Sequence, residues 1–86
     1  AYQLGTRKAI KKPEPIGINE EATIYVSIRV NRLGKVIFAK GGQKGTTLYD
    51  PTLIRNCEKT AKNTTFTPKE DSAEIEVGTI IYRFSY

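Results

Sequence analysis

Cys57 is the residue with the most reactive chemistry in this chain of 86 residues, which has no second cysteine and no histidine. A catalytic cysteine needs an electropositive, accessible setting and usually a histidine partner that accepts its proton. Leu53, Cys57 and Ala61 instead follow one another at helical spacing, as on the buried face of a helix. We therefore predict that Cys57 is a small core residue.

The other polar residues form no pattern typical of an enzyme. The chain has no carboxylate pair at useful spacing and no cluster of metal ligands. Glycines 41, 42 and 45 resemble a phosphate-binding loop, but they match neither the Walker pattern nor Gly-x-Gly-x-x-Gly. We interpret them as a flexible connection between a strand and a helix. The sequence predicts no enzyme, no catalytic residue, no metal and no cofactor.

The chain also carries a net positive charge. Lysine and arginine number 14 against 9 aspartates and glutamates, which gives a formal net charge of +5. Such a charge favours anionic partners, such as nucleic acid, acidic membranes or acidic peptides. Four of the cations lie between Arg7 and Lys12, before Pro13-Glu-Pro15. We assign residues 1–16 as a basic, proline-containing lead-in or linker end, which is either a contact arm or a solvated segment.

The elements that would position these residues begin with a hairpin. From Thr23 to Asn31, apolar and polar side chains alternate. This alternation predicts a strand with one buried and one solvated face, as in an antiparallel sheet covered on a single side. The sequence Asn31-Arg-Leu-Gly34 predicts a turn with Gly34 in the left-handed conformation. A second strand should follow over residues 35–40.

A helix and a last strand complete the domain. Asp50 and Pro51 predict the helix start, because aspartate caps free N–H groups and proline fits the first helical position. Residues 69–76 are polar and acidic, which indicates a loop. In the closing strand, the more polar set that begins at Thr79 should face outward, and the alternate set that begins at Ile80 should face the core.

Together these elements predict an α+β fold, a small antiparallel three-stranded sheet with one main helix packed on one face. A helix of about 12 residues spans ~18 Å, about the length of a six-residue strand, and so returns the chain across the sheet. The strand order should be 2-1-3, with the third strand at an open edge, where an extended peptide can dock. The residues expected to be buried together are Ile24, Val26, Ile28, Leu53, Ile54, Cys57, Ile80 and Phe84.

Four segments in sequence order resemble the C-terminal domain of the TonB energy transducers. They are Tyr25–Val36, Lys44–Leu53, Thr65–Pro68 and Val77–Phe84. The resemblance covers residues 17–86, which we assign as one TonB C-terminal-like domain. The Gly/Thr loop before the helix, and the lack of a Tyr-Pro motif there, indicate a divergent branch of the family.

The resemblance implies a periplasmic domain of a protein anchored in the inner membrane by an upstream region. Such a domain binds the N-terminal box segment of outer-membrane TonB-dependent transporters by β-strand addition. It transmits proton-motive energy from an inner-membrane complex for uptake of siderophores or other nutrients. We expect no nucleic-acid partner, and the open edge also allows a homodimer. The expected partner-binding residues are Gly78, Thr79, Ile80, Ile81, Tyr82, Arg83, Phe84 and Ser85.

The main alternative is a small basic α+β module that binds single-stranded nucleic acid on its open sheet face. Tyr25 with Arg29 and Arg83 would form a stacking platform there. Only one aromatic residue is expected on that face, whereas sheets that bind nucleic acid typically present two or three. Ordinary cross-strand packing is therefore the preferred interpretation. A further alternative is an inhibitor domain with no role in transduction.

Overall fold

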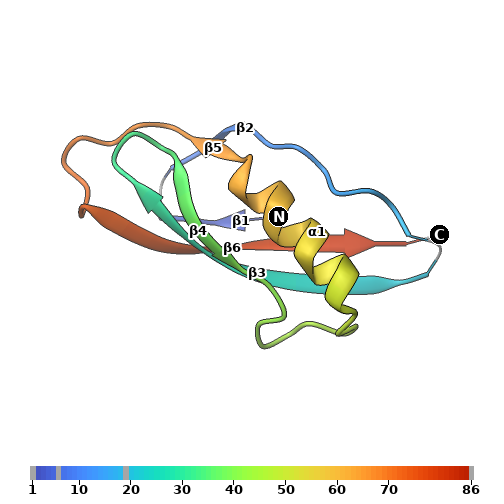
Figure 1. The fold of residues 1–86 in the computed structure, drawn as a ribbon. Coiled ribbons are helices and arrows are strands. Elements are labelled where there is room, and N and C mark those ends of the chain that lie inside the picture. Colours follow the sequence, from blue (N-terminus) through green and yellow to red (C-terminus); the bar gives the residue numbers. More distant parts are fainter. Residues whose placement is uncertain (1, 6, 19, 86) are drawn as a thin grey trace.

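The computed structural model describes residues 2–5, 7–18 and 20–85. Within these ranges one helix accompanies an antiparallel four-stranded sheet, in the order β1-β6-β3-β4, and a separate two-stranded pair, β2-β5 (Figure 1). The α+β class and the packing of one helix on an antiparallel sheet are as predicted. The elements are β1 (Tyr2–Gln3), β2 (Ala9–Lys11), β3 (Ala22–Asn31), β4 (Val36–Lys40), α1 (Pro51–Lys62), β5 (Thr65–Phe66) and β6 (Ile75–Phe84).

The β3–β4 hairpin is built by the turn that the sequence predicted. The Asn31 side-chain oxygen accepts hydrogen bonds from the backbone N–H groups of Leu33 and Lys35, both at 3.0 Å. Gly34 has φ +89°, and a Cβ at this position would overlap the carbonyl oxygen of Phe66. Glycine is thus required here both by the left-handed backbone and by the close approach of β5.

Helix α1 begins where the sequence predicted. The Asp50 carboxylate accepts hydrogen bonds from the N–H groups of Thr52 and Leu53 at 2.9 and 3.1 Å, and Pro51 occupies the first turn. Leu53, Cys57 and Ala61 form the buried face of the helix. In the described part of the chain, no helix has the length and apolar character needed to cross a membrane.

The core lies between α1 and the inner face of the sheet. Six of the eight predicted core residues are buried in it, namely Ile24, Val26, Ile28, Leu53, Cys57 and Ile80. Ile54 and Phe84 are only partly buried and pack against its margin. Ile54 lies over Gly41 and Gly42, at the side of the helix, and Phe84 lies at the last position of β6.

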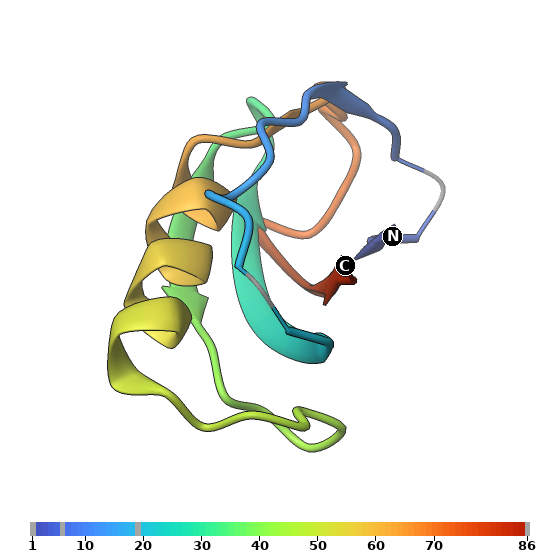
Figure 2. The same ribbon diagram turned by 90° about the vertical axis from the view of Figure 1, so that its right-hand side faces the viewer.

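The predicted strand order needs a correction at its outer edge. The order β4-β3-β6 corresponds to the predicted 2-1-3, but β6 is not the outermost strand, because β1 pairs with it. The sheet therefore has four strands rather than three. Figure 2 shows β1 at the edge of the sheet that lies farther from α1. The sequence does not reveal β1, because two residues are too few to show a strand period.

Residues 8–18 run from β1 back to β3. The β2 strand pairs antiparallel with β5, and the N–H of Thr67 donates to the carbonyl of Lys8 at 2.8 Å. Residues 13, 14 and 16 then line a hollow with the last turns of α1. Much of the predicted lead-in is thus in contact with the rest of the domain, and the boundary at residue 16 stays a prediction.

Candidate functional site

Strand β6 carries the residues predicted to bind a partner. It pairs with β3 along its whole length, from Ile75 opposite Asn31 to Phe84 opposite Ala22. Gly78, Ile80 and Tyr82 are buried on the inner face, whereas Thr79 and Ile81 are half-buried on the outer face. Arg83 and Ser85 are exposed, Phe84 is half-buried, and Ser85 follows the end of the strand. The structure therefore brings all eight predicted residues to one strand and the residue after it.

The outer edge of β6, predicted to be open, is partly occupied. Tyr2 lies opposite Ile80, and Gln3 lies opposite Thr79, in an antiparallel pairing. A Cβ on Gly78 would lie 2.5 Å from the carbonyl oxygen of Gln3 and 2.7 Å from a methyl carbon of Leu4. Gly78 therefore allows β1 and Leu4 to approach β6 closely. A glycine inside a strand is the sequence signal that could have indicated this approach.

The C-terminal end of the β6 edge differs from the part that β1 covers. No described strand pairs with residues 82–84 on the side away from β3. A hollow of about 260 Å³ lies between this end and residues 14, 15, 17 and 18. A second hollow, of about 530 Å³, lies on the β3 side of this end, against residues 21–23. Arg83, Phe84 and Ser85 line both hollows. This end is accessible to an extended chain.

Side chains also hold β1 in place. Leu4 is 2% exposed and belongs to the hydrophobic core. The Tyr2 ring packs edge-to-face on Phe66 with ring centroids 5.4 Å apart, and its hydroxyl accepts a hydrogen bond of 2.9 Å from the N–H of Ala9. Tyr2 and Leu4 thus place two apolar groups on one side of the strand, two residues apart.

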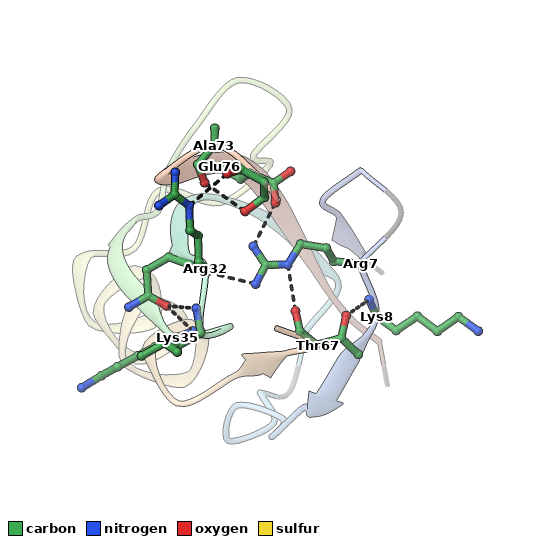
Figure 3. A network of polar contacts seen from close by, with 10 residues as sticks. Arg7, Lys8, Arg32, Lys35, Thr67, Ala73 and Glu76 are labelled. Atoms are coloured by element: carbon green, nitrogen blue, oxygen red, sulfur yellow. Dashed lines mark hydrogen bonds and ion pairs between the residues drawn. The ribbon is translucent and has the colours of Figure 1, made fainter. Parts of the chain in front are cut away.

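The Arg7 side chain also holds this N-terminal segment in place (Figure 3). Its side chain is 1% exposed, and it donates hydrogen bonds of 2.9 Å to the Glu76 carboxylate and to the backbone carbonyls of Asn31 and Thr67. A buried ion pair is sustained when further hydrogen bonds satisfy its donors, and these carbonyls do so. Arg7 therefore joins the N-terminal segment to the ends of β3 and β5 and to the start of β6.

The buried position of Arg7 corrects both interpretations of the basic segment at this residue, since it is neither in a contact arm nor solvated. Lys8, Lys11 and Lys12 remain exposed. One signal was present in the sequence. Glu76 lies opposite the buried Val30, on the core side of the strand, where a carboxylate requires a buried cation. Which cation would reach it was not readable from spacing, because the two residues are 69 positions apart.

The outer face of the sheet holds the residues of the nucleic-acid alternative and one more aromatic ring. Arg29 lies opposite Phe38 across the β3–β4 pair, with its guanidinium carbon 4.7 Å from the ring centroid. Phe38 is 39% exposed. The Tyr25 ring is half-buried, and a Cβ on Gly45 would come within 2.7 Å of it. The glycine loop therefore packs against Tyr25 and links β4 to α1.

Burial favours the neutral forms of Cys57 and Tyr82. Burial, with a smaller contribution from Glu58, raises the pKa of the Cys57 thiol from 9.0 to about 11. Burial also raises the pKa of Tyr82 from 10.0 to about 12. The Tyr82 hydroxyl has no hydrogen-bond partner of good geometry among the described residues, although the Thr64 side chain is near enough to favour the phenolate slightly. A thiol in this setting is a core residue, as predicted.

Comparison with known proteins adds no family to this geometry. No protein-family model, curated protein or solved structure matches the chain. Among the described residues, no three cysteine, aspartate or glutamate side chains lie close enough to hold a metal ion together. The arrangement at β6 is thus a strand edge with a short covering strand at one part and an accessible end at the other.

Proposed function

We propose that the outer edge of β6 binds an extended peptide from a protein partner by β-strand addition. The pairing of β1 with Thr79 and Ile80 supports this proposal, because it is an example of a strand added at this edge. Backbone hydrogen bonds would supply affinity, and the hollow between residues 82–85 and residues 14, 15, 17 and 18 would receive side chains of the peptide. The net charge of +5 would favour capture of acidic segments.

The resemblance to TonB C-terminal domains gives this proposal its biological form. In that form, the chain is the periplasmic domain of an energy transducer anchored in the inner membrane by an upstream region. Its partner is the N-terminal box segment of an outer-membrane TonB-dependent transporter, and it passes on energy from an inner-membrane proton-motive complex for nutrient uptake. Strand addition suits this role because a ladder of backbone bonds tolerates differing sequences.

Titration of isotope-labelled protein with a box peptide tests the proposal. We expect amide shifts concentrated in residues 78–85. A matched peptide with proline at its central position should not bind, because proline lacks the donor that the ladder needs. The same peptide pair leaves the protein unaltered, so no change in folding enters the comparison. Shifts on residues 7–12 or on α1, or equal binding of the proline peptide, would contradict strand addition at β6.

The contact of Arg29 with Phe38 favours one second candidate, binding of single-stranded nucleic acid on the outer sheet face. This pair adds an exposed aromatic ring and a stacked cation to the same sheet face as Tyr25, where the sequence predicted a single aromatic. A filter-binding assay with single-stranded RNA at physiological salt tests it. Phe38→Ala should weaken such binding at least fivefold, which corresponds to loss of one stacking contact of about 1 kcal/mol.

A further inference from the structure

The contacts of β1 indicate which side chains fit the covered part of the β6 edge. Tyr2 and Leu4 project to the same side of β1, and both contact the interior of the domain. The Tyr2 and Phe66 rings pack edge-to-face, and Leu4 lies against Gly78. The intervening Gln3 is exposed. The site under β1 thus has one aromatic and one aliphatic subsite, separated by a residue that points away.

The direction of the strand is also defined. Tyr2 pairs with Ile80 and Gln3 with Thr79, so the occupant runs antiparallel to β6. Leu4 and the Gln3 carbonyl lie so close to Gly78 that β6 has no room for a side chain at this position. An incoming strand must therefore place its aliphatic residue two positions after its aromatic residue, measured toward its own C-terminus.

The covering strand is short and is attached by a separate anchor. The β1 strand has two residues, and Gly5, which follows Leu4, has φ +54°, a left-handed conformation that turns the chain. Beyond this turn, Arg7 holds the segment through Glu76, Asn31 and Thr67 without using the β1 ladder. The Arg7 backbone N–H donates to the Leu4 carbonyl at 3.1 Å, so this turn hydrogen bond joins the cover to the anchor, whereas the three side-chain bonds of Arg7 do not involve the β1 ladder.

We infer that the β6 edge selects an antiparallel peptide of the form aromatic–x–leucine, and that β1 is the resident strand which this peptide displaces. The inference rests on the proposed function, since it names the peptide class for the same edge. A resident strand competes as a tethered ligand, so the apparent Kd of the peptide equals its intrinsic Kd divided by the fraction of molecules with β1 open.

A disulfide that locks β1 in place tests the displacement. Gln3 and Thr79 are direct cross-strand partners, and such pairs have Cα separations of about 4.5–5.5 Å, within the range that a disulfide spans. In the double variant Gln3→Cys/Thr79→Cys, the native Cys57 is buried and does not compete for pairing. The probe is the peptide Ala-Tyr-Gln-Leu-Gly, and the control is Ala-Ser-Gln-Ser-Gly, both followed by amide shifts of the labelled protein.

We expect the oxidised double variant to bind the probe at least tenfold more weakly than the same protein after reduction. Leu4→Ser, which removes the aliphatic side chain of the resident strand, should strengthen probe binding several-fold, and its spectrum must show an intact fold. The control peptide should bind at least tenfold more weakly than the probe. Because oxidation and reduction compare one protein with itself, the lock remains informative if Leu4→Ser does not fold.

Each contrary outcome identifies what fails. Equal binding of the probe by oxidised and reduced protein would show that β1 is not the displaced strand. Equal binding of the two peptides would show that the edge does not select the aromatic–x–leucine form. If box peptides bind both redox forms equally at residues 82–85, strand addition stands and only the displacement fails. If no peptide binds either form, the proposed function fails as well.

Discussion

The two edges of the sheet differ in how they are protected from other strands. Strand β4 has five residues, its pairing with β3 contains a register shift opposite Arg29 and Val30, and it ends at Lys40. Short length, irregular register and lysine all discourage pairing with another chain. Strand β6 has ten residues with a continuous register against β3, and its outer edge carries the two-residue β1. One edge is thus closed by its own geometry, and the other is covered by a separate segment.

This difference indicates where an added strand can bind. At β4, the bridge from Lys35 to Thr65 and the hydrogen bond of 2.8 Å from the Phe66 N–H to the Gly34 carbonyl fix the start of the edge within the fold. At β6, the cover is held by Tyr2, Leu4 and the Arg7 anchor. Arg7 also donates to the Asn31 carbonyl of the β3–β4 hairpin turn, so Tyr2 and Leu4 are the positions whose side chains can be altered while that turn keeps its hydrogen bonds. Substitutions can therefore test the two edges separately.

The largest effect is expected from Arg7→Ala. It removes three hydrogen bonds and leaves the partly buried Glu76 without its cation, which should cost about 3 kcal/mol, the lower end of the range for a fully buried pair. Denaturant titration measures the change in the free energy of unfolding. Amide exchange should accelerate in β1 and β2 and stay slow in β4.

Arg32→Ala is the matched control for this prediction. Arg32 is an exposed cation whose Nε donates one hydrogen bond of 3.0 Å to the Ser72 carbonyl. Its removal should cost less than about 1 kcal/mol. Equal losses in the two variants would mean that Arg7 does not anchor the cover of β6.

The accessible end of β6 gives the next largest effect. Phe84→Ala should cost about 2 kcal/mol, less than the about 3–5 kcal/mol typical of a fully buried phenylalanine, because Phe84 lies at the margin of the core. Equilibrium unfolding in urea provides the measurement. A loss below about 1 kcal/mol would show that this end of the strand contributes no packing, and the hollows beside it would then lack a fixed wall.

The sequence-based predictions were correct where the contacts are local and failed where the contacts join distant parts of the chain. The turn at Gly34 and the helix start at Asp50 were predictable because their signals lie within a few neighbouring residues. The outer position of β1 and the anchor at Arg7 were missed, because their partners on β6 are at the other end of the chain. A two-residue strand has no period, and an arginine is the same letter whether buried or solvated.

At the candidate site, the sequence predicted that the closing strand pairs with the first strand of the hairpin, but it did not predict that β1 covers part of the outer edge of that strand. All eight predicted residues lie on β6 or directly after it. Gly78 was expected as a contact residue, whereas in the structure it is the point where the chain's own N-terminal segment comes close. The lack of a Cβ at this position and the inward-facing Glu76 were local signals of the cover in the sequence.

A smaller effect is expected from Gly78→Ala. The added Cβ would press on the Gln3 carbonyl and on Leu4 but on no atom of β3 within its nearest contacts, so β1 should shift outward. We expect a cost of about 1 kcal/mol and faster amide exchange at β1. Gly17→Ala is the control, because a Cβ there would meet nothing within 4 Å and its φ is not positive. A matching change in both variants would point to backbone entropy rather than to contact with β1.

The smallest effect is expected at Cys57, which lies under α1 and reports whether the core opens with β1. Its thiol is buried and its pKa is raised from 9.0 to about 11, so labelling by a thiol reagent requires the helix to leave the sheet. If β1 moves as a separate cover, Gly78→Ala should change the labelling rate at pH 8 by less than about twofold, whereas denaturant should raise it by orders of magnitude.

The raised pKa of Cys57 also predicts a pH dependence of the free energy of unfolding. Because the folded state retains the thiol proton between pH 9.0 and about 11 while the unfolded state loses it, this contribution to stability is present below pH 9.0 and is lost as pH rises through about 11. Cys57→Ala should flatten that part of the plot of stability against pH. In the labelling experiment, a Cys57 labelling rate that rises together with amide exchange in β1 would show that the cover and the core open together.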